Sequence, residues 1–475
     1  MIHIPILRAG LSYKSLNLAH VSHIQTGEPL AVVSQANRGL IAKDLYQTKE
    51  NKQTLEDLSV SELLAICKKA ANLFMESELP LDDTLQSPDD YIQQVSGTTG
   101  LPQSLCLKNM GKIRLVLDEM EAVLDGLTRG LDLSIMDSGW GTQNERPLSY
   151  VPQTDTLGAV LPSNSPGVHS LWLPAIPLKT PLVLKPGSEE PWTPFRIAQA
   201  LIEAGCPPET FGFYPTDYSG AAEILLQCGR SLLFGGGSTV APWQANPNVQ
   251  IHGPGRSKVI IADDKISRWE EYLDLIVSSV AENGGRSCIN GSGVWVTSHG
   301  REIAEALAKR LADITPKPLD DPEAEIAAFT NPKVAEGISG LIDNQLKVPG
   351  AMDLTAKYRD GGRVIEKAGC TFLSPSVIWC DDPEHPLANT EFLFPFVSVV
   401  EVPQGEILDR IGPSLVVTAI TQDDGFIVDL HRSPDVERLN IGAISTNQIS
   451  WDQPHEGNLF DFLYQQRALQ VSRGQ

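Results

Sequence analysis

Apolar residues follow two different spacings along the chain, and each spacing predicts a different kind of element. In residues 59–77 and 109–129 they recur every three or four positions, which predicts amphipathic helices. We therefore expect the first third of the chain to be mostly helical. Residues 139–152 (GWGTQNERPLSYVP) are polar and rich in turn formers, which indicates an excursion from the domain.

From residue 156 onward, short apolar runs alternate with helical patterns. Strands are predicted at TLGAV, PLVLK, TFGFY and SLLFG, with helices over 192–205 and in YSGAAEILLQCG. A second series starts at KVIIADD and continues through a helix, the strand GVWVTS and the helix REIAEALAKRLADI. This alternation predicts an α/β fold with parallel sheets that hold ligands at the carboxyl ends of their strands. Gly253-Pro254-Gly255 marks the boundary between two such domains.

Length, charge and cysteine usage limit the class of protein. A chain of 475 residues is long enough for two or three domains. The net charge of −22 argues against partners such as nucleic acids or membrane surfaces, because binding phosphates needs clustered cations. No apolar run approaches the ~20 residues of a membrane-spanning helix, and the N-terminus has no secretory pattern. The seven cysteines are irregularly spaced without a CxxC pair, so we expect no disulfide framework, no metal site and a cytoplasmic protein.

Three motifs at the ends of predicted elements contain residues suited to chemistry. They are PSNSPG (162–167), FGGGST (234–239) and NGGRSC (283–288). The glycines of the second motif allow the backbone to approach a ligand closely, although three glycines also make an ordinary turn. Cys288 follows Arg286, and a nearby cation lowers a thiol pKa and favours the nucleophilic thiolate. For a single cysteine, the competing interpretation is a small buried apolar residue.

Taken together, these motifs resemble the aldehyde dehydrogenase superfamily from about residue 156 to 450, in the same order and at similar separations. PSNSP matches the family's Pro-x-Asn-x-Pro turn, and LVLKPGSEEP matches its Lys-Pro strand end. FGGGST stands where the family has Phe-Thr-Gly-Ser, and NGGRSC matches Asn-x-Gly-Gln-x-Cys. TEFLFPFV, with Glu391, matches Glu-Glu-x-Phe-Gly-Pro.

The resemblance implies NAD(P)-dependent oxidation of a small-molecule aldehyde through a thiohemiacetal and a thioester on Cys288. It assigns oxyanion stabilisation to the Asn164 amide and the Cys288 backbone N–H. It assigns cofactor binding to a larger set: Pro162, Ser163, Lys185, Ser188, Gly236, Gly237 and Glu391. Ser188 stands where NAD-preferring members often carry a Glu, so either NAD or NADP is expected, with Glu189 and Glu190 close by.

The resemblance also implies a domain plan. A Rossmann-type cofactor domain is expected from residues 1–130 and 152–257, and an α/β catalytic domain from 258–448. Residues 131–151 and 449–475 are expected to form a small β oligomerisation element in which RALQV pairs across subunits of a homodimer or homotetramer. The substrate pocket is expected to be lined partly by the N-terminal helices and the loop around 445–457.

The chain departs from the family at the residue that activates water. Hydrolytic members carry a catalytic Glu in Glu-Leu-Gly-Gly-Lys-Ser-Pro, whereas this chain reads HGPGRSK from His252 to Lys258. The GPG tripeptide resembles the acylating branch, in which coenzyme A is the cosubstrate and takes the acyl group in place of water. We therefore expect an acylating enzyme, with Arg256, Lys258 and Arg286 available to an anionic ligand.

Two alternatives stay open. His252 could act as a general base on water or on the coenzyme A thiol, which in the first case gives a hydrolytic enzyme that forms a carboxylate. It could also be a structural histidine, which is the reading we favour. A catalytically silent member that keeps the fold for binding is the third reading, against which the retained Asn164 and Cys288 argue.

Overall fold

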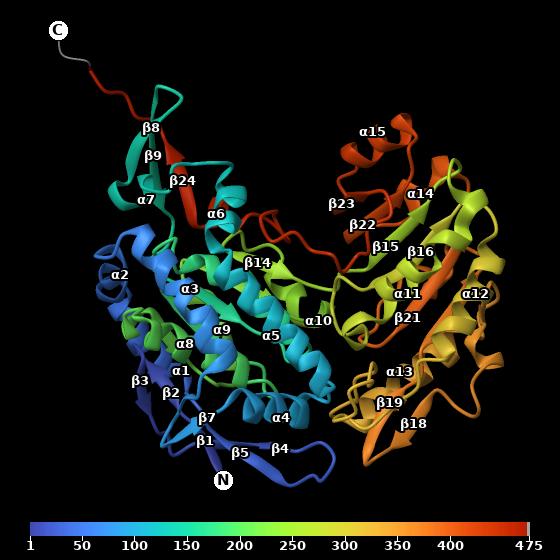
Figure 1. The fold of residues 1–475 in the computed structure, drawn as a ribbon, viewed down its shortest axis with the longest axis horizontal. Helices are drawn as coiled ribbons and strands as arrows, with labels where there is room; N and C mark the ends of the chain where they lie inside the picture. Colours follow the sequence, from blue (N-terminus) through green and yellow to red (C-terminus); the bar gives the residue numbers. More distant parts are fainter. Residues whose placement is uncertain (473–475) are drawn as a thin grey trace.

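Two seven-stranded sheets form the centres of two lobes in the computed structural model, which describes residues 1–472 (Figure 1). Residues 473–475, the end of the expected oligomerisation element, lie outside the described residues. The first sheet has the order β14 (Val249–His252), β13 (Arg230–Phe234), β10 (Leu157–Val160), β11 (Leu182–Lys185), β12 (Phe211–Phe213), β2 (Ile6–Arg8) and β3 (Leu11–Tyr13). The second has the order β17 (Ala351–Asp353), β20 (Ser376–Cys380), β21 (Phe396–Glu401), β16 (Gly291–Val296), β15 (Ser257–Ile261), β22 (Ser414–Ile420) and β23 (Val436–Ile441).

The strand order of the first sheet creates a switch point beside β10. That strand pairs in parallel with β11 on one side and with β13 on the other, while β12 and β14 continue the parallel sheet outward. The antiparallel strands β2 and β3 close the β12 edge. Ligands of such sheets bind beyond the carboxyl ends of the strands at the switch point. The predicted α/β class with a Rossmann-type sheet is confirmed.

Both faces of the second sheet are covered by helices. In β15, Val259 and Ile261 pack into one core with α11 (Leu273–Ala281) and α12 (Gly300–Ala312). Ile260, between them, packs into the opposite core with α13 (Pro332–Gln345), α14 (Gln404–Arg410) and α15 (Asp424–Arg432). Successive side chains of a strand point to opposite faces, so a strand buried on both sides reads as a continuous apolar run such as KVII.

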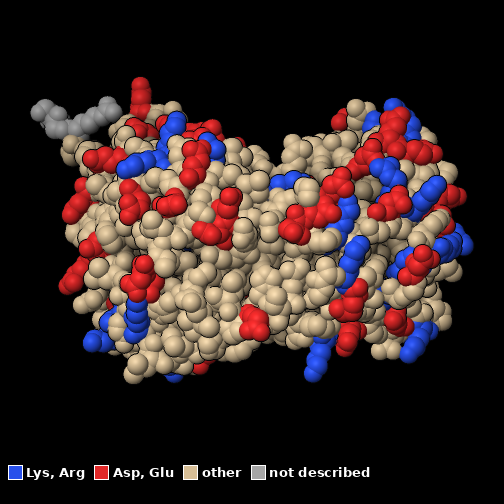
Figure 2. Space-filling view, turned by 60° about the horizontal axis from the view of Figure 1, so that its bottom comes forward, with Lys and Arg blue, Asp and Glu red and all other residues tan. Residues whose placement is uncertain are grey.

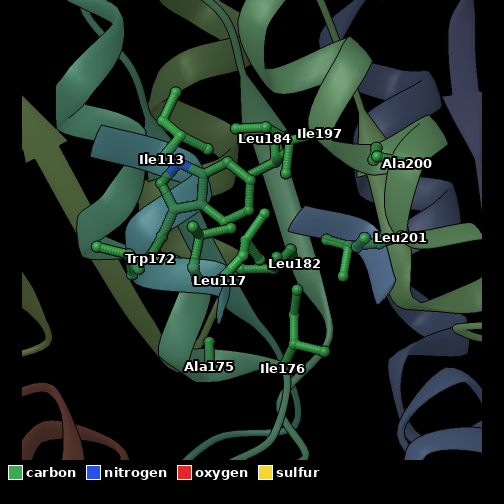
Figure 3. Close-up of a cluster of buried hydrophobic side chains, with 14 of the residues drawn as sticks. Ile113, Leu117, Trp172, Ala175, Ile176, Leu182, Leu184, Ile197, Ala200 and Leu201 are labelled. Atoms are coloured by element: carbon green, nitrogen blue, oxygen red, sulfur yellow. The ribbon is translucent and has the colours of Figure 1, made fainter. Parts of the chain in front are cut away.

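The first sheet is covered in the same way. On one face lie α3 (Val60–Glu76), α5 (Gln103–Asp118) and α8 (Trp192–Ala204), and on the other α1 (Arg38–Asp44) and α9 (Tyr218–Gln227). Figure 3 shows side chains of α5, β11 and α8 gathered around the indole ring of Trp172, which is fully buried. This core holds the strands that end at the switch point.

Several predicted helices are confirmed, and one is corrected. The helix predicted at 59–77 is α3, whose Ser59 and Glu62 form a capping box. The helix predicted at 192–205 is α8, which ends at Gly205 with φ of 114°. The prediction of one helix over 109–129 is wrong, because the chain breaks at Glu119 between α5 and α6 (Met120–Thr128).

The expectation of a mostly helical first third is also wrong for its beginning. Residues 2–34 form five strands, of which β1 (Ile2–Ile4), β5 (Pro29–Ser34) and β4 (Leu18–Ser22) make a sheet of their own, while β2 and β3 join the first sheet. Three of these strands, β1, β2 and β3, have only three residues, and β4 lies at a sheet edge. Strands of that length are too short for an alternating pattern to stand out in the sequence.

A three-stranded antiparallel sheet projects from the first lobe and consists of β24 (Tyr464–Arg467), β9 (Arg146–Pro152) and β8 (Trp140–Gln143) (Figure 1). The excursion predicted at 139–152 is the β8–β9 hairpin, whose Asn144 and Glu145 have φ of 51° and 64°, as a two-residue turn of this hand requires. The strand predicted at RALQV is misplaced, because β24 is YQQR and residues 468–472 form no strand. Association of subunits through this sheet stays a prediction.

Short elements complete the described chain: α2 (Thr48–Glu56), α4 (Pro88–Thr99), α7 (Ile135–Ser138), α10 (Gly237–Val240), α16 (Leu459–Leu463), and the hairpins β6–β7 (Leu79–Leu81, Thr84–Gln86) and β18–β19 (Val364–Lys367, Cys370–Leu373). Among residues 1–472, no helix combines the length and the apolar character needed to cross a bilayer. Figure 2 shows acidic and basic side chains interspersed over both lobes on one face.

The loop before Cys288 owes its shape to its glycines. Asn283, Gly284 and Gly285 take positive φ values of 55°, 65° and 69° in succession. A Cβ added to Gly285 would lie 2.4 Å from the Phe394 carbonyl carbon and from the Pro395 nitrogen. The NGG sequence therefore lets the Cys288 loop press directly on the backbone of the segment that precedes β21.

We expect Gly285→Ala to destabilise the protein by about 2 kcal/mol or more, since it combines backbone strain with overpacking. The matched control is Gly340→Ala in α13, where nothing lies within 4 Å of an added Cβ. That change should raise the free energy of unfolding by about 0.5–1 kcal/mol. Urea unfolding of both variants checks this, and equal effects would contradict the close contact.

Candidate active site

The carboxyl edge of the first sheet faces the amino edge of the second across a cavity of about 690 Å³. Loops that follow β10 and β13 meet loops that precede β15, β16 and β21. Ligand cavities in proteins commonly have this size. Eight of the predicted site residues line it: Pro162, Ser163, Asn164, Gly236, Gly237, His252, Cys288 and Glu391.

Lys185 and Ser188 lie outside this lining but next to Glu189, which belongs to it. The Ser188 hydroxyl donates to Glu189 Oε2 at 2.8 Å. Lys185 ends β11, and burial lowers the pKa of its ammonium while the Glu189 charge opposes that shift. The structure thus brings the predicted residues together around one cavity, with these two at its margin.

The two acids after Ser188 have different surroundings. Glu190 is buried and accepts hydrogen bonds from the Thr193 backbone N–H at 2.8 Å and from its hydroxyl at 2.7 Å. Glu189 instead reaches the cavity wall, where the Ser163 hydroxyl donates to its Oε2 at 2.8 Å. One carboxylate is therefore fixed beside the loop that follows β10.

A network of buried amides joins the loops that carry Asn164 and Cys288. The Asn283 amide donates to the hydroxyls of Ser165 at 3.0 Å and Ser287 at 2.9 Å, and its oxygen accepts from Asn109 Nδ2 at 2.7 Å. The Asn109 oxygen in turn accepts the Gly167 backbone N–H at 3.1 Å. Asn109 of α5 was not predicted, although a polar residue on the apolar stripe of a helix is a usable signal.

Asn164 is held close to the nucleophile candidate. Its Nδ2 donates to the Arg286 carbonyl at 2.7 Å, two residues before Cys288. An amide nitrogen carries two hydrogens, so the second remains available to an oxygen bound in the cavity. The side chain is thus oriented for the role predicted for it.

The electrostatics around Cys288 differ from the expectation. Burial raises the pKa of its thiol well above the ordinary value, and the charges of Glu456 and Glu391 raise it further. The predicted activation by Arg286 is wrong. That guanidinium donates to the Ala328 carbonyl and lies over the Phe329 ring at 5.1 Å, and burial lowers its own pKa to about 10. The thiol therefore needs a proton acceptor before it can react.

The three cations expected to serve an anionic ligand, Arg256, Lys258 and Arg286, lie in different surroundings. Lys258 is buried in β15, where its ammonium donates to the Arg256 carbonyl at 2.7 Å and to the Ser414 hydroxyl at 3.1 Å. Burial lowers the pKa of Lys258 to about 7. Arg256 is exposed to solvent, and only Arg286 lines the cavity.

The Gly-Pro-Gly turn has a packing role next to Cys288. A Cβ on Gly255 would lie 1.9 Å from the Cys288 carbonyl oxygen, so only glycine fits there. The next residue, Arg256, has φ of 46° and its backbone N–H donates to the Glu391 carboxylate. Burial raises the pKa of Glu391 to about 7. Close packing alone thus accounts for the second glycine of the tripeptide.

His252 pairs with a residue that sequence reasoning missed. It ends β14, its ring stacks on Phe234 with centroids 4.2 Å apart, and its Nδ1 shares a hydrogen bond with Glu456 Oε2. The two side chains are 4% and 12% exposed. Glu456 lies in the 445–457 loop, which was expected to line the pocket and does so through this residue. No motif singled it out.

The described residues offer no set of ligands for a metal ion. Within residues 1–472, no group of three or more His, Cys, Asp or Glu side chains is arranged to hold an ion. Besides Arg286, the titratable groups of the cavity are the Cys288 thiol, the His252 imidazole and three carboxylates from Glu189, Glu391 and Glu456. Such a set suits proton transfer and nucleophilic attack.

Comparisons with known proteins agree with this geometry. Betaine aldehyde dehydrogenase of Vibrio vulnificus (strain YJ016) is 24% identical over 415 residues, covering 82% of this chain and 77% of that one. The structure of gamma-glutamyl-gamma-aminobutyraldehyde dehydrogenase from Burkholderia cenocepacia matches with a TM-score of 0.76 at 16% identity, covering 98% of this chain and 96% of that chain. An indole-3-acetaldehyde dehydrogenase complexed with NAD+ matches with a TM-score of 0.77 at 17% identity, covering 98% and 96%.

Structural likeness at these identities shows the fold alone. The family assignment comes from sequence, because the profile of the aldehyde dehydrogenase family matches residues 13–408, which is most of the chain. The chain belongs to the aldehyde dehydrogenase family.

Proposed function

We propose that this protein oxidises an aldehyde, with NAD as the hydride acceptor, through a covalent thioester on Cys288. One observation carries the proposal: the Cys288 thiol, the Asn164 amide and the open Gly236-Gly237 turn line the same cavity at the switch point of a Rossmann-type sheet. The aldehyde dehydrogenases among its relatives and structural neighbours, one of them complexed with NAD+, support the same class of reaction.

The residues around the switch point fit a dinucleotide. Nothing lies within 4 Å of a Cβ added to Gly236 or Gly237, so the backbone there is open to a ligand. Pro162 and Ser163, which follow β10, line the same cavity. Glu189, fixed by two serine hydroxyls, can accept hydrogen bonds from ribose hydroxyls. When bound, NAD supplies the hydride acceptor for the reaction.

The chain's own residues then bind and orient the aldehyde. Cys288 Sγ, once deprotonated, attacks the carbonyl carbon, and the carbonyl oxygen gains negative charge. The free N–H of Asn164 and the Cys288 backbone N–H are the donors for that oxygen. Loss of hydride oxidises the adduct by two electrons and leaves the acyl group on sulfur as a thioester.

Two acceptors for the acyl group are in question. The sequence ground for coenzyme A, and hence for an acylating enzyme, is that His252 replaces the family's catalytic Glu and is followed by Gly-Pro-Gly. The structure weakens this argument for coenzyme A in two ways. The contact with Cys288 alone requires glycine at residue 255, and the Glu456 carboxylate forms a hydrogen bond with His252. Water is therefore our first candidate and coenzyme A the second.

With purified protein and a panel of aldehydes, we expect NAD+ reduction without coenzyme A, followed as NADH absorbance. Cys288→Ala should lower the rate by about 10⁴-fold or more while NADH still binds, since the covalent route is lost. Turnover that depends on coenzyme A would establish the acylating reaction instead. A wild type that binds NADH but reduces no NAD+ with any aldehyde would favour a silent member of the family.

The raised pKa of Cys288 predicts slow alkylation at neutral pH. Each unit by which the pKa rises lowers the thiolate fraction about tenfold, so iodoacetamide should react at pH 7 at least about tenfold more slowly than with free cysteine. The rate should keep rising through pH 9. The other six cysteines are buried, and mass spectrometry after digestion assigns the site. A plateau near pH 7 would contradict the prediction.

The fixed Glu189 carboxylate predicts that NADH binds more tightly than NADPH, because it repels a 2′-phosphate. Glu189→Gln should tighten NADPH binding by at least about tenfold, or about 1.4 kcal/mol, and weaken NADH binding. Fluorescence titration with each reduced cofactor measures both effects in the same preparation. Equal affinity of the wild type for the two cofactors would refute the assignment.

A further inference from the structure

We propose that Glu456, held in place by His252, is the proton acceptor for the water that releases the acyl group from Cys288. This inference rests on the proposed function, and it names a residue outside the HGPGRSK segment. Position 252, which carries the carboxylate in hydrolytic members of the family, here carries the imidazole that positions one.

The carboxylate has one oxygen engaged and one free. Glu456 Oε2 is bound to His252 Nδ1, and Oε1 has no hydrogen-bond partner within residues 1–472. Glu456 lines the same cavity as Cys288, and among charged groups it has the largest effect on the pKa of that thiol. A carboxylate that lines the same cavity as the sulfur can meet a water that attacks an acyl group attached there.

The backbone around Glu456 is held in a conformation that side chains rarely adopt. Glu456 has φ of 51° and Gly457 has φ of 105°. Gln250 of β14 donates to the Glu456 carbonyl, and Arg438 of β23 donates to the carbonyl of Pro454. Strained residues persist where the surrounding structure determines them, and such places cluster at active sites. Here the strained turn aims the carboxylate at His252 and the cavity.

His252 also lines a second cavity of about 40 Å³ in addition to the main one. Four buried polar atoms of the small cavity's lining lack partners among the described residues: Ser170 Oγ, Gln250 Oε1, His252 Nε2 and His455 Nδ1. A polar cavity of this size has room for one water. Burial lowers the pKa of His455 to about 3, so that ring stays neutral and adds no competing cation.

The proposed step balances without any redox change. The water oxygen attacks the thioester carbonyl carbon while Glu456 Oε1 takes one of the water protons. The tetrahedral adduct collapses, the C–S bond breaks, and the sulfur leaves as a thiolate that takes up the proton held by Glu456. The products are a carboxylic acid and the free Cys288 thiol.

The test uses 4-nitrophenyl acetate, because this activated ester transfers its acetyl group to a thiol without NAD. We expect Glu456→Gln to release about one nitrophenolate per active site in a burst and then to turn over at least about 100-fold more slowly than wild type. Intact-mass spectrometry should show the variant carrying one acetyl group, located on Cys288. Glu456→Asp, which keeps a carboxylate, should recover part of the rate.

His252→Asn tests positioning. It should slow turnover by about tenfold after the burst, and a double Glu456→Gln/His252→Asn variant should lose no more than Glu456→Gln alone. The matched control is Glu437→Gln, which removes an exposed carboxylate from β23 and should keep the wild-type burst and turnover. Thermal unfolding and NADH binding of each variant show that the fold is intact.

The outcomes separate this inference from the proposed function. Unchanged turnover in Glu456→Gln, or loss of the burst together with turnover, overturns the role of Glu456 toward water. Wild-type NAD+ reduction that requires coenzyme A overturns it as well and leaves aldehyde oxidation standing. Absence of NAD+ reduction in the wild type, with ester hydrolysis still dependent on Glu456, refutes the proposed function alone.

Discussion

The site depends on two contacts in which backbone meets backbone with no side chain between. Gly285 lies against Phe394 and Pro395, and Gly255 lies against the Cys288 carbonyl. They pack the loops that precede β15, β16 and β21 against one another at the amino edge of the second sheet, where Cys288 and Glu391 face the cavity. Any side chain at either glycine would separate those loops, which makes the placement of Cys288 a consequence of sheet packing.

The charges around the nucleophile follow from this packing. Three carboxylates line the cavity, and its one cation, among the described residues, faces the Ala328 carbonyl and the Phe329 ring. Burial and the charges of Glu456 and Glu391 favour the thiol of Cys288 over the thiolate. Reactivity at Cys288 therefore has to come from proton transfer and from a bound ligand, since no cation supplies it. This explains why carboxylates and an imidazole, which can exchange protons, form the wall beside the sulfur.

Sequence patterns predicted the parts of the fold that repeat a regular period. Most strands and helices from residue 156 to 312 lie where the apolar runs place them, because parallel strands covered on both faces are continuously apolar, as KVII is. The strand β14 and the short helix α10 in this range were not predicted. Among the strands of residues 2–34, β1, β2 and β3 were missed because three residues carry no detectable period, and the longer β4 and β5 were missed as well. Motif comparison found Cys288 and Asn164, but Asn109 and Glu456 act through contacts between distant segments, 174 and 204 residues from Asn283 and His252, which one sequence does not reveal.

The same catalytic group can be supplied from different positions in the chain, and the carboxylate near Cys288 is an example. A carboxylate at the end of β14 would need only a Glu at residue 252. A carboxylate brought by the 445–457 loop needs a strained turn at Glu456, a carbonyl held by Gln250 and an imidazole to receive it. All three are present, and the strained turn is costly for a loop that merely connects two elements. Replacement of Glu at residue 252 is thus better explained by relocation of the carboxylate than by its loss, so the residue at one motif position is weak evidence for the acyl acceptor.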